Sequence, residues 1–230
     1  GVDRAGGKGP VPARSPGRPP GPNPPGGGAW MATADATHPA LGRAWRLVLV
    51  PRAGLVDEVA ARERSGWRPA GTWATEALRV AAWRPRAALD SDHRSIPHEL
   101  DWLRTAVHLT KGCYRGQETV ARVHNLGRPP RRVVMLHLDG SGHLLPEPGA
   151  AVSLDEREVG RVTTVARHHV LGPVALAVVK RNVPAGAELL VAAEGGSVAA
   201  AQEVVVPADG VSVDRPAPRP ALPGLRPQRP

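Results

Sequence analysis

The chain has 230 residues, a formal net charge of +9 and a single cysteine. One cysteine excludes an internal disulfide, supplies no metal cage by itself and favours a reducing compartment. No apolar run approaches the roughly 20 residues that a membrane-spanning helix needs. We therefore expect a cytoplasmic protein that does not cross a membrane.

Both ends of the chain are rich in glycine and proline. These two residue types occupy 17 of the positions 1–28, and residues 215–230 contain six prolines. Neither end has an apolar period, so we expect a disordered or unrelated leader over 1–45 and a disordered tail over 207–230. Residues 1–28 contain four basic residues, and residues 215–230 contain four more. Because much of the charge is on tails, direct binding of nucleic acid is not expected.

The foldable part opens with one strand and one helix. Residues 46–51 form a nearly continuous apolar run, which predicts a strand. Residues 55–63 have a helical period that would turn Val56, Val59 and Ala60 inward.

Two further helices precede the middle of the chain. Thr72 is a suitable N-cap for the first, which ends before Pro85 and carries Glu76 and Arg79 on a polar face. The second begins near Pro97, a residue favoured in the first turn. The apolar faces predicted for the two helices consist of Trp73, Ala77, Val80 and Ala81, and of Leu100, Leu103 and Val107.

After Pro129 and Pro130 the pattern changes to short β-rich runs separated by turn residues. The runs are Val133–Leu138, Ala150–Leu154, Val159–Val165, Val174–Val179, Leu189–Val191 and Val204–Val206. Six short strands without intervening helices predict a small β-barrel.

Residues 111–118 read Lys-Gly-Cys-Tyr-Arg-Gly-Gln-Glu and contain the only cysteine and the only tyrosine of the chain. Gly112 and Gly116 indicate a tight turn. Gln117 and Glu118 then begin an apolar-periodic run that stops at Gly127, which predicts a helix. Lys111 and Arg115 flank Cys113, and cations near a helix N-terminus favour the thiolate, which is the reactive form of a cysteine.

The octet 111–118 resembles the signature loop, Lys-Gly-Cys-Tyr-x-Gly-Gln-Glu, of the YgfZ branch of the glycine-cleavage T-protein (aminomethyltransferase) superfamily. Three other segments agree in the same order: residues 71–80, residues 96–99, and residues 160–164 followed by 174–178. The resemblance covers about residues 46–206 and implies an α+β fold. The implied fold comprises a remnant of the folate-binding domain with a helical connector over 46–128, and a C-terminal β-barrel over 129–206. The family's upstream half has no counterpart, so the chain resembles a C-terminal portion.

The resemblance implies an accessory role in iron–sulfur cluster assembly or repair, and thereby support of tRNA-modifying enzymes. Iron–sulfur assembly factors or client enzymes would be the partners. Arg79 matches a folate-contacting arginine, and Glu99 is the second candidate for the folate site. Tetrahydrofolate binding would be weak or lost without the upstream half. Cys113 would be the redox-sensitive or ligating group and could hold a transient iron–sulfur cluster, within the signature loop of Lys111, Gly112, Cys113, Tyr114, Gly116, Gln117 and Glu118.

Several alternatives remain open from the residues. Cys113 could instead be a nucleophile, with His108 or His124 as its base, or a packing and recognition residue. A tetrahydrofolate-dependent aminomethyltransferase would need a carboxylate, and the matched region offers Glu99 or Glu118. An RNA-binding protein would use the basic cluster of Arg115, Arg122, Arg128, Arg131 and Arg132. No aromatic residues that could stack on bases lie between these arginines, so a solvated face or a surface for an acidic partner is the better interpretation of the cluster. The pair His168 and His169 is a poor metal site, because neighbours on a strand point to opposite faces.

Overall fold

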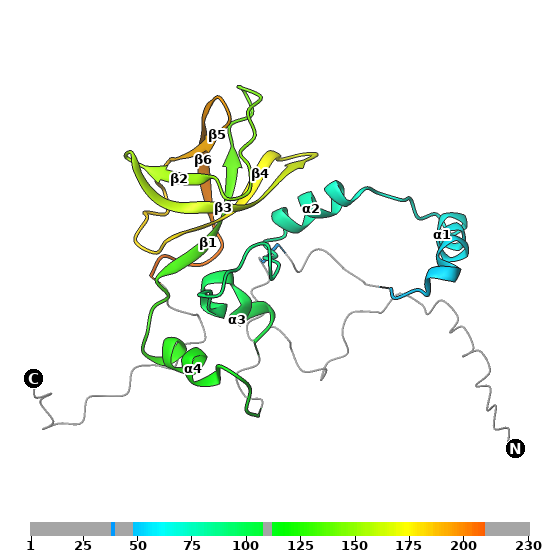
Figure 1. The fold of residues 1–230 in the computed structure, drawn as a ribbon, viewed down its shortest axis with the longest axis horizontal. Helices are drawn as coiled ribbons and strands as arrows, with labels where there is room; N and C mark the ends of the chain where they lie inside the picture. Colours follow the sequence, from blue (N-terminus) through cyan, green and yellow to red (C-terminus); the bar gives the residue numbers. More distant parts are fainter. Residues whose placement is uncertain (1–37, 40–47, 108–111, 210–230) are drawn as a thin grey trace, which may run out of the picture.

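The computed structural model describes residues 38–39, 48–107 and 112–209. Helical segments precede the strands along the chain, and the strands form one body at the top of the view in Figure 1. The helical segments are η1 (Arg52–Gly54), α1 (Leu55–Arg64), α2 (Thr72–Ala81), η2 (Pro97–Leu100), α3 (Trp102–Thr105) and α4 (Gln117–Asn125). The strands are β1 (Arg131–Leu138), β2 (Ala151–Leu154), β3 (Arg157–His168), β4 (Gly172–Lys180), β5 (Leu189–Ala193) and β6 (Gly196–Val204).

The six strands close into an antiparallel barrel in the order β1-β4-β3-β2-β5-β6. β1 pairs with β4 on one side and with β6 on the other, which closes the ring. The predicted α+β class and the six-stranded barrel are thus confirmed. The position predicted for the last strand is wrong, because β6 ends where the prediction began, at Val204. Its run of small residues, Ala199 to Ala201, carries little β signal, and pairing with β5 and β1 decides its conformation.

Alternate residues of β1 serve two different cores. Val134 and Leu136 point into the barrel, where they pack with residues such as Val152 and Leu189. Val133 and Met135 point outward and pack against the helical segments. The period-2 alternation of a strand therefore fills the barrel and at the same time attaches the helices to it.

α2 lies against the outside of the barrel and contacts β3 and β4. Ala77, Val80 and Ala81 are buried, as the helical period predicts. Trp73 is 87% exposed, so its predicted burial is wrong. It lies in the first turn of α2, where no described element covers it. The N-cap is Gly71 rather than Thr72, which is the first helical residue.

The helix predicted from Pro97 is present as two short pieces, η2 and α3. Asp101 separates them with a left-handed backbone, φ 61°. Leu100 and Leu103 are buried, as predicted. η2 packs on β1, and Arg104 of α3 donates to the carbonyl of Val205, just after β6, at 3.0 Å.

The first predicted strand is wrong where the structure describes it, since residues 48–50 have no strand conformation. No neighbouring strand is available to them among the described residues, and an extended segment without a hydrogen-bonded partner is not a strand. α1 has the predicted bounds within one residue, yet none of its residues is buried. Val56 is 78% exposed and Val59 is 42% exposed, so their predicted inward position is wrong.

The described part of the chain contains no helix long and apolar enough to cross a membrane. Most of the leader, most of the tail, His108 and Lys111 lie outside the described residues.

Candidate functional site

The described part of the signature loop places Cys113 at the surface, where the residue is exposed. Gly116 has a left-handed backbone, φ 86°, and directly precedes the first residue of α4, Gln117. Only glycine adopts this conformation freely, so Gly116 sets the turn from the loop into the helix. The amide of Gln117 donates to the carbonyl of Tyr114 at 3.2 Å. The loop thus presents Cys113 to solvent ahead of α4.

Arg79, the predicted folate-contacting arginine, is 5% exposed and bonded to the protein through all three guanidinium nitrogens. Nε donates to Glu76 at 2.9 Å, Nη1 donates to Asp90 at 2.7 Å and to the Arg84 carbonyl at 2.8 Å, and Nη2 donates to the Thr164 hydroxyl at 2.9 Å. These bonds join α2 to β3. The guanidinium has no free donor to offer a ligand carboxylate in this arrangement.

Asp90 is the centre of this network, although nothing in its local sequence singled it out. The carboxylate is 1% exposed and accepts from Arg79, from the Arg86 amide at 2.8 Å and from the Thr164 hydroxyl at 2.7 Å. Thr163 donates to the same carboxylate. Both threonines lie at a register shift between β3 and β4, which turns consecutive residues toward Asp90. The two adjacent threonines in the segment 160–164 therefore have a structural role, which is to hydrogen-bond the buried carboxylate of Asp90.

Glu99, the second predicted folate residue, is 1% exposed and paired with Arg131. Its two oxygens accept from Arg131 at 3.1 and 2.9 Å. Arg131 also donates to Asp92 at 2.8 Å. This hydrogen bond is the main cause that holds the pKa of Asp92 well below its usual range, and the bonds to Asp92 and Glu99 raise the pKa of Arg131. Glu99 therefore joins η2 to β1 through an ion pair.

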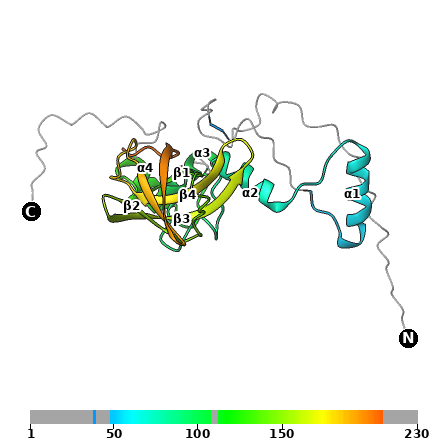
Figure 2. The ribbon, with the colours of Figure 1, turned by 90° about the horizontal axis from the view of Figure 1, so that it is seen from above.

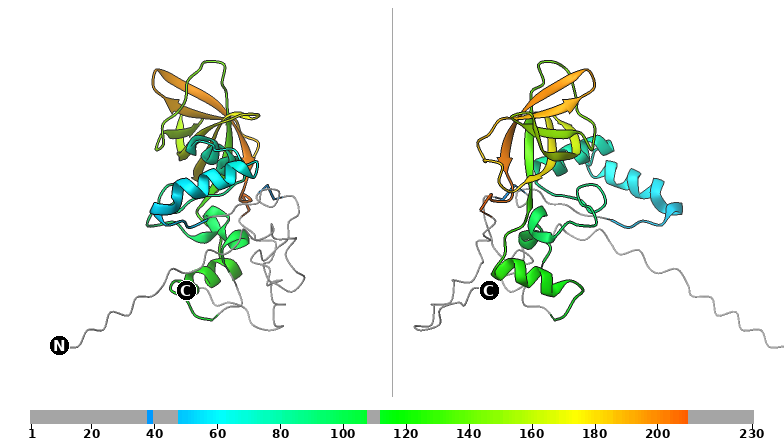
Figure 3. Two further views of the ribbon diagram at one scale, coloured as in Figure 1. Left: turned by 90° about the vertical axis from the view of Figure 1, so that its right-hand side faces the viewer. Right: turned by 60° about the vertical axis from the view of Figure 1, so that its left-hand side comes forward.

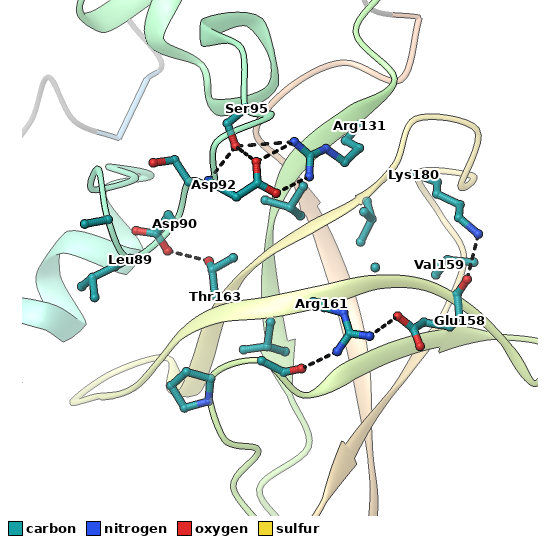
Figure 4. Close-up of a pocket in the computed structure, with 18 residues that line it drawn as sticks. Leu89, Asp90, Asp92, Ser95, Arg131, Glu158, Val159, Arg161, Thr163 and Lys180 are labelled. Atoms are coloured by element: carbon teal, nitrogen blue, oxygen red, sulfur yellow. Dashed lines mark hydrogen bonds and ion pairs between the residues drawn. The ribbon is translucent and has the colours of Figure 1, made fainter.

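A cavity of about 810 Å³ lies beside these two networks (Figure 4). The loop around Leu89 to Asp92 forms one wall, and β3 and β4 form the other. Arg131, Arg161 and Lys180 contribute positive charge to its lining. Each cation is bonded within the protein: Arg161 pairs with Glu158 at 2.9 Å and the Lys180 amine donates to the Glu158 carbonyl at 3.0 Å. The size suits a small molecule, but each of the three cations is already bonded to another group of the protein.

The basic cluster predicted from sequence does not form one face. Arg132 is 0% exposed, with its Nη2 donating to the Val183 carbonyl and to Gln202, and burial lowers its pKa. Arg131 is held by two carboxylates, as above. Arg115, Arg122 and Arg128 are exposed. The interpretation of the cluster as one solvated face or partner surface is therefore wrong for Arg132, whose position on a strand turns it into the barrel.

His98 and His124 are both buried, with ring centroids 6.5 Å apart. His124, one of the two bases considered for Cys113, therefore faces η2 rather than open solvent. Burial, aided by the nearby His124, lowers the pKa of His98 to about 4. Neither ring nitrogen of His98 has a hydrogen-bond partner among the described residues.

We expect the folded state to lose stability as the pH falls from about 6.5 to about 4. In the unfolded chain His98 binds a proton at the ordinary histidine pKa of about 6.5, whereas in the folded chain its pKa is lowered to about 4. Stability is therefore fully present above pH 6.5 and decreases below it, by about 1 to 3 kcal/mol for this group. Urea unfolding across this range should show a shallower loss for His98→Leu than for the parent. His93→Leu, at an exposed position, should follow the parent, and equal slopes for all three would contradict the assignment.

His168 and His169 lie at the end of β3 with ring centroids 4.5 Å apart. Nδ1 of His168 accepts from the amides of Val170 and Leu171. That nitrogen therefore stabilises the β3–β4 turn. Among the described residues no group of three or more His, Cys, Asp or Glu side chains could hold a metal ion.

Residues 131–208 match the glycine cleavage T-protein C-terminal barrel domain. A candidate chloroplastic transferase of Arabidopsis thaliana is 32% identical over 100 residues, which are 42% of this chain and 21% of that protein. The aminomethyltransferase T of the glycine cleavage system from Bartonella henselae has the same fold, with a TM-score of 0.53 and 21% identity over 68% of this chain and 43% of that one.

The chain thus spans about a fifth of the curated relative and less than half of the solved T-protein. The family match covers the strands of the barrel and the residues directly after them. Residues 131–208, which contain the six strands of the closed barrel, are therefore similar to the C-terminal barrel domain of glycine cleavage T-proteins.

Proposed function

We propose that this chain is an accessory protein of the YgfZ type that supports iron–sulfur cluster assembly or repair. The observation that carries the proposal is the exposed Cys113 in a loop whose sequence matches the YgfZ signature at every specified position. A thiolate is a soft ligand suited to iron–sulfur clusters, which take four protein ligands. One cysteine supplies a single ligand, so a client enzyme or assembly factor would supply the others.

The internal contacts of Arg79 and Glu99 bear on the role of folate. Both side chains are nearly inaccessible and are bonded to oppositely charged protein groups. They do not fit a folate molecule in this arrangement, because a ligand would have to break a buried ion pair to reach either one. Tetrahydrofolate would therefore bind weakly to this chain, and the accessory role proposed here assigns it no chemical step.

The alternative is a tetrahydrofolate-dependent aminomethyltransferase. It is suggested by the solved aminomethyltransferase T, whose fold is similar to that of this chain. Its candidate carboxylates are Glu99, which is buried in an ion pair, and Glu118, which is exposed in the first turn of α4. A general base must reach the proton that it takes. Glu118 is thus the carboxylate that this alternative would use.

Complementation separates the two functions. In a strain that lacks its own protein of this type, the parent chain should restore the activity of iron–sulfur enzymes, including those that modify tRNA. Cys113→Ser should fail to do so while folding normally, because an exposed serine neither ligates the cluster iron as a thiolate does nor undergoes thiol redox chemistry.

Thr119→Ser, at an exposed position of α4, is the matched control and should behave as the parent. Full rescue by Cys113→Ser would remove the thiol from the mechanism and refute the proposal in this form. Loss of rescue by Glu118→Gln alone, with Cys113→Ser active, would instead favour the transferase.

A further inference from the structure

Arg132 is the largest of the side chains that the fold buries completely. It lies on β1 two positions before Val134, so it shares the inner face of the strand with Val134 and Leu136. The neighbouring strands close around β1 in one compact body (Figures 2 and 3). The guanidinium is therefore enclosed at the end of the barrel where β1 begins.

The hydrogen bonds of this guanidinium are few, and their acceptors are neutral. Nη2 donates to the carbonyl of Val183 at 3.0 Å and to the side-chain oxygen of Gln202 at 3.1 Å. Nε and Nη1 of Arg132 are buried, and neither has a hydrogen-bond partner among the described residues. Burial lowers the pKa of Arg132, and no carboxylate of the described residues opposes this effect. Arg132 thus carries a buried positive charge that the described part of the chain does not neutralise.

A buried charge without a partner is unusual, because removing an ion from water is costly. Buried ions in native proteins are paired, and a buried polar atom that lacks a protein partner indicates a bound water molecule or ion. A water molecule would accept from the N–H groups but would leave the charge uncompensated. An anion does both, and hydrogen bonds between a guanidinium and an anion are stronger than those between neutral groups. The chemistry of this site therefore favours an anion over water.

The charges around this end of the barrel also favour an anion. Arg131 lies opposite Lys180 where β1 begins and β4 ends, and Arg181 follows directly. Two carboxylates hold Arg131, whereas Lys180 bonds to a backbone carbonyl. The carboxylate in the β4–β5 turn is that of Glu188, which is exposed. Several cations close together raise the local concentration of anions.

We propose that Arg132 is the centre of a binding site for a small inorganic anion of about the size of chloride. Complete burial limits the size of the ligand, because the β4–β5 turn bonds to the guanidinium and covers it. The amide of Gln202 fastens this turn by donating to the carbonyls of Pro184 at 2.9 Å and Ala187 at 2.8 Å. Residues 184–186 of the turn are exposed. A single turn therefore separates the site from solvent, and the anion enters when this turn opens.

Thermal unfolding at constant ionic strength tests the site, with sodium gluconate replaced stepwise by sodium chloride. The unfolding midpoint of the parent chain should rise by about 2 to 4 °C and level off by about 0.2 M chloride, because a ligand that binds the folded state stabilises it. Arg132→Met replaces the buried charge by an apolar side chain and should show no rise. Arg167→Met, at an exposed position of β3, is the matched control and should respond as the parent does. Glu188→Gln should do the same.

Anomalous diffraction from crystals of the parent chain soaked in sodium bromide locates the ion without any variant. A bromide peak beside Nε or Nη1 of Arg132 is the expected result. A water molecule in this place, or equal responses of the parent and Arg132→Met to chloride, would overturn the proposal. A bromide peak without any effect of chloride on the midpoint would mean an adventitious ion only and would overturn it as well. An altered response of Glu188→Gln would identify that carboxylate as the counter-ion, again against the proposal.

Discussion

Replacing Arg79 by methionine is expected to lower the free energy of unfolding by about 3 to 5 kcal/mol, the loss typical of removing one partner of a buried ion pair. Asp90 would keep its contacts to the Arg86 amide and to two threonine hydroxyls, but its charge would stay buried without a cation. The ion pair joins α2 and its following loop to β3 of the barrel. Urea unfolding followed by circular dichroism measures the loss.

Arg86→Met is the matched control for this variant, because Arg86 also pairs with Glu76 but its side chain is 54% exposed. Exposed ion pairs contribute about 0 to 1 kcal/mol, so this variant should remain close to the parent. Removing both buried charges with Arg79→Met and Asp90→Leu should cost less than the two single changes added together. A small loss for Arg79→Met, equal to that of Arg86→Met, would show that Arg79 is not committed to the network and would restore it as a candidate for ligand binding.

Replacing Gly160 by alanine is expected to cost about 3 kcal/mol, at the upper end of the range for overpacking a well-packed interior. A Cβ atom at Gly160 would clash with the carbonyl oxygen of Val178 and would lie 2.8 Å from the Cα atom of Val179. Both contacts are to the backbone of β4, which cannot move aside as a flexible side chain can. The barrel would have to open between β3 and β4 to admit one methyl group.

Gly186→Ala is the control for the glycine substitution. A Cβ atom there meets nothing within 4 Å, so the change should be neutral or slightly stabilising. Thermal or urea unfolding of the two variants side by side gives the comparison. Equal effects at Gly160 and Gly186 would contradict the close approach of β3 to β4.

Where local signals and long-range contacts agree, the sequence was sufficient to predict the structure. The β-rich runs from Val133 onward are short and separated by turn residues, so they predict a barrel that the structure confirms. α4 begins at Gln117, as its apolar period and Gly116 predict. These elements are specified by neighbours in the chain, through turn chemistry and side-chain periodicity.

Where burial depends on a partner that is distant or absent, the sequence was misleading. The period of α1 predicted an inward face, but its residues are exposed because no described element packs on it. Trp73 is exposed for the same reason. The apolar face of a helix shows that it can be buried and does not show what covers it.

For the candidate site, the sequence by itself determined the chemistry-bearing loop: its single cysteine, its glycines and the start of the following helix. Only the tertiary structure decided the roles of the charged residues. Arg79 meets Asp90 eleven positions away and Thr164 eighty-five positions away, and Glu99 meets Arg131 across thirty-two positions. Ion pairs between such distant segments produce no periodic pattern in the sequence. The sequence also does not distinguish a charged side chain that faces solvent from one that binds a ligand or a buried partner.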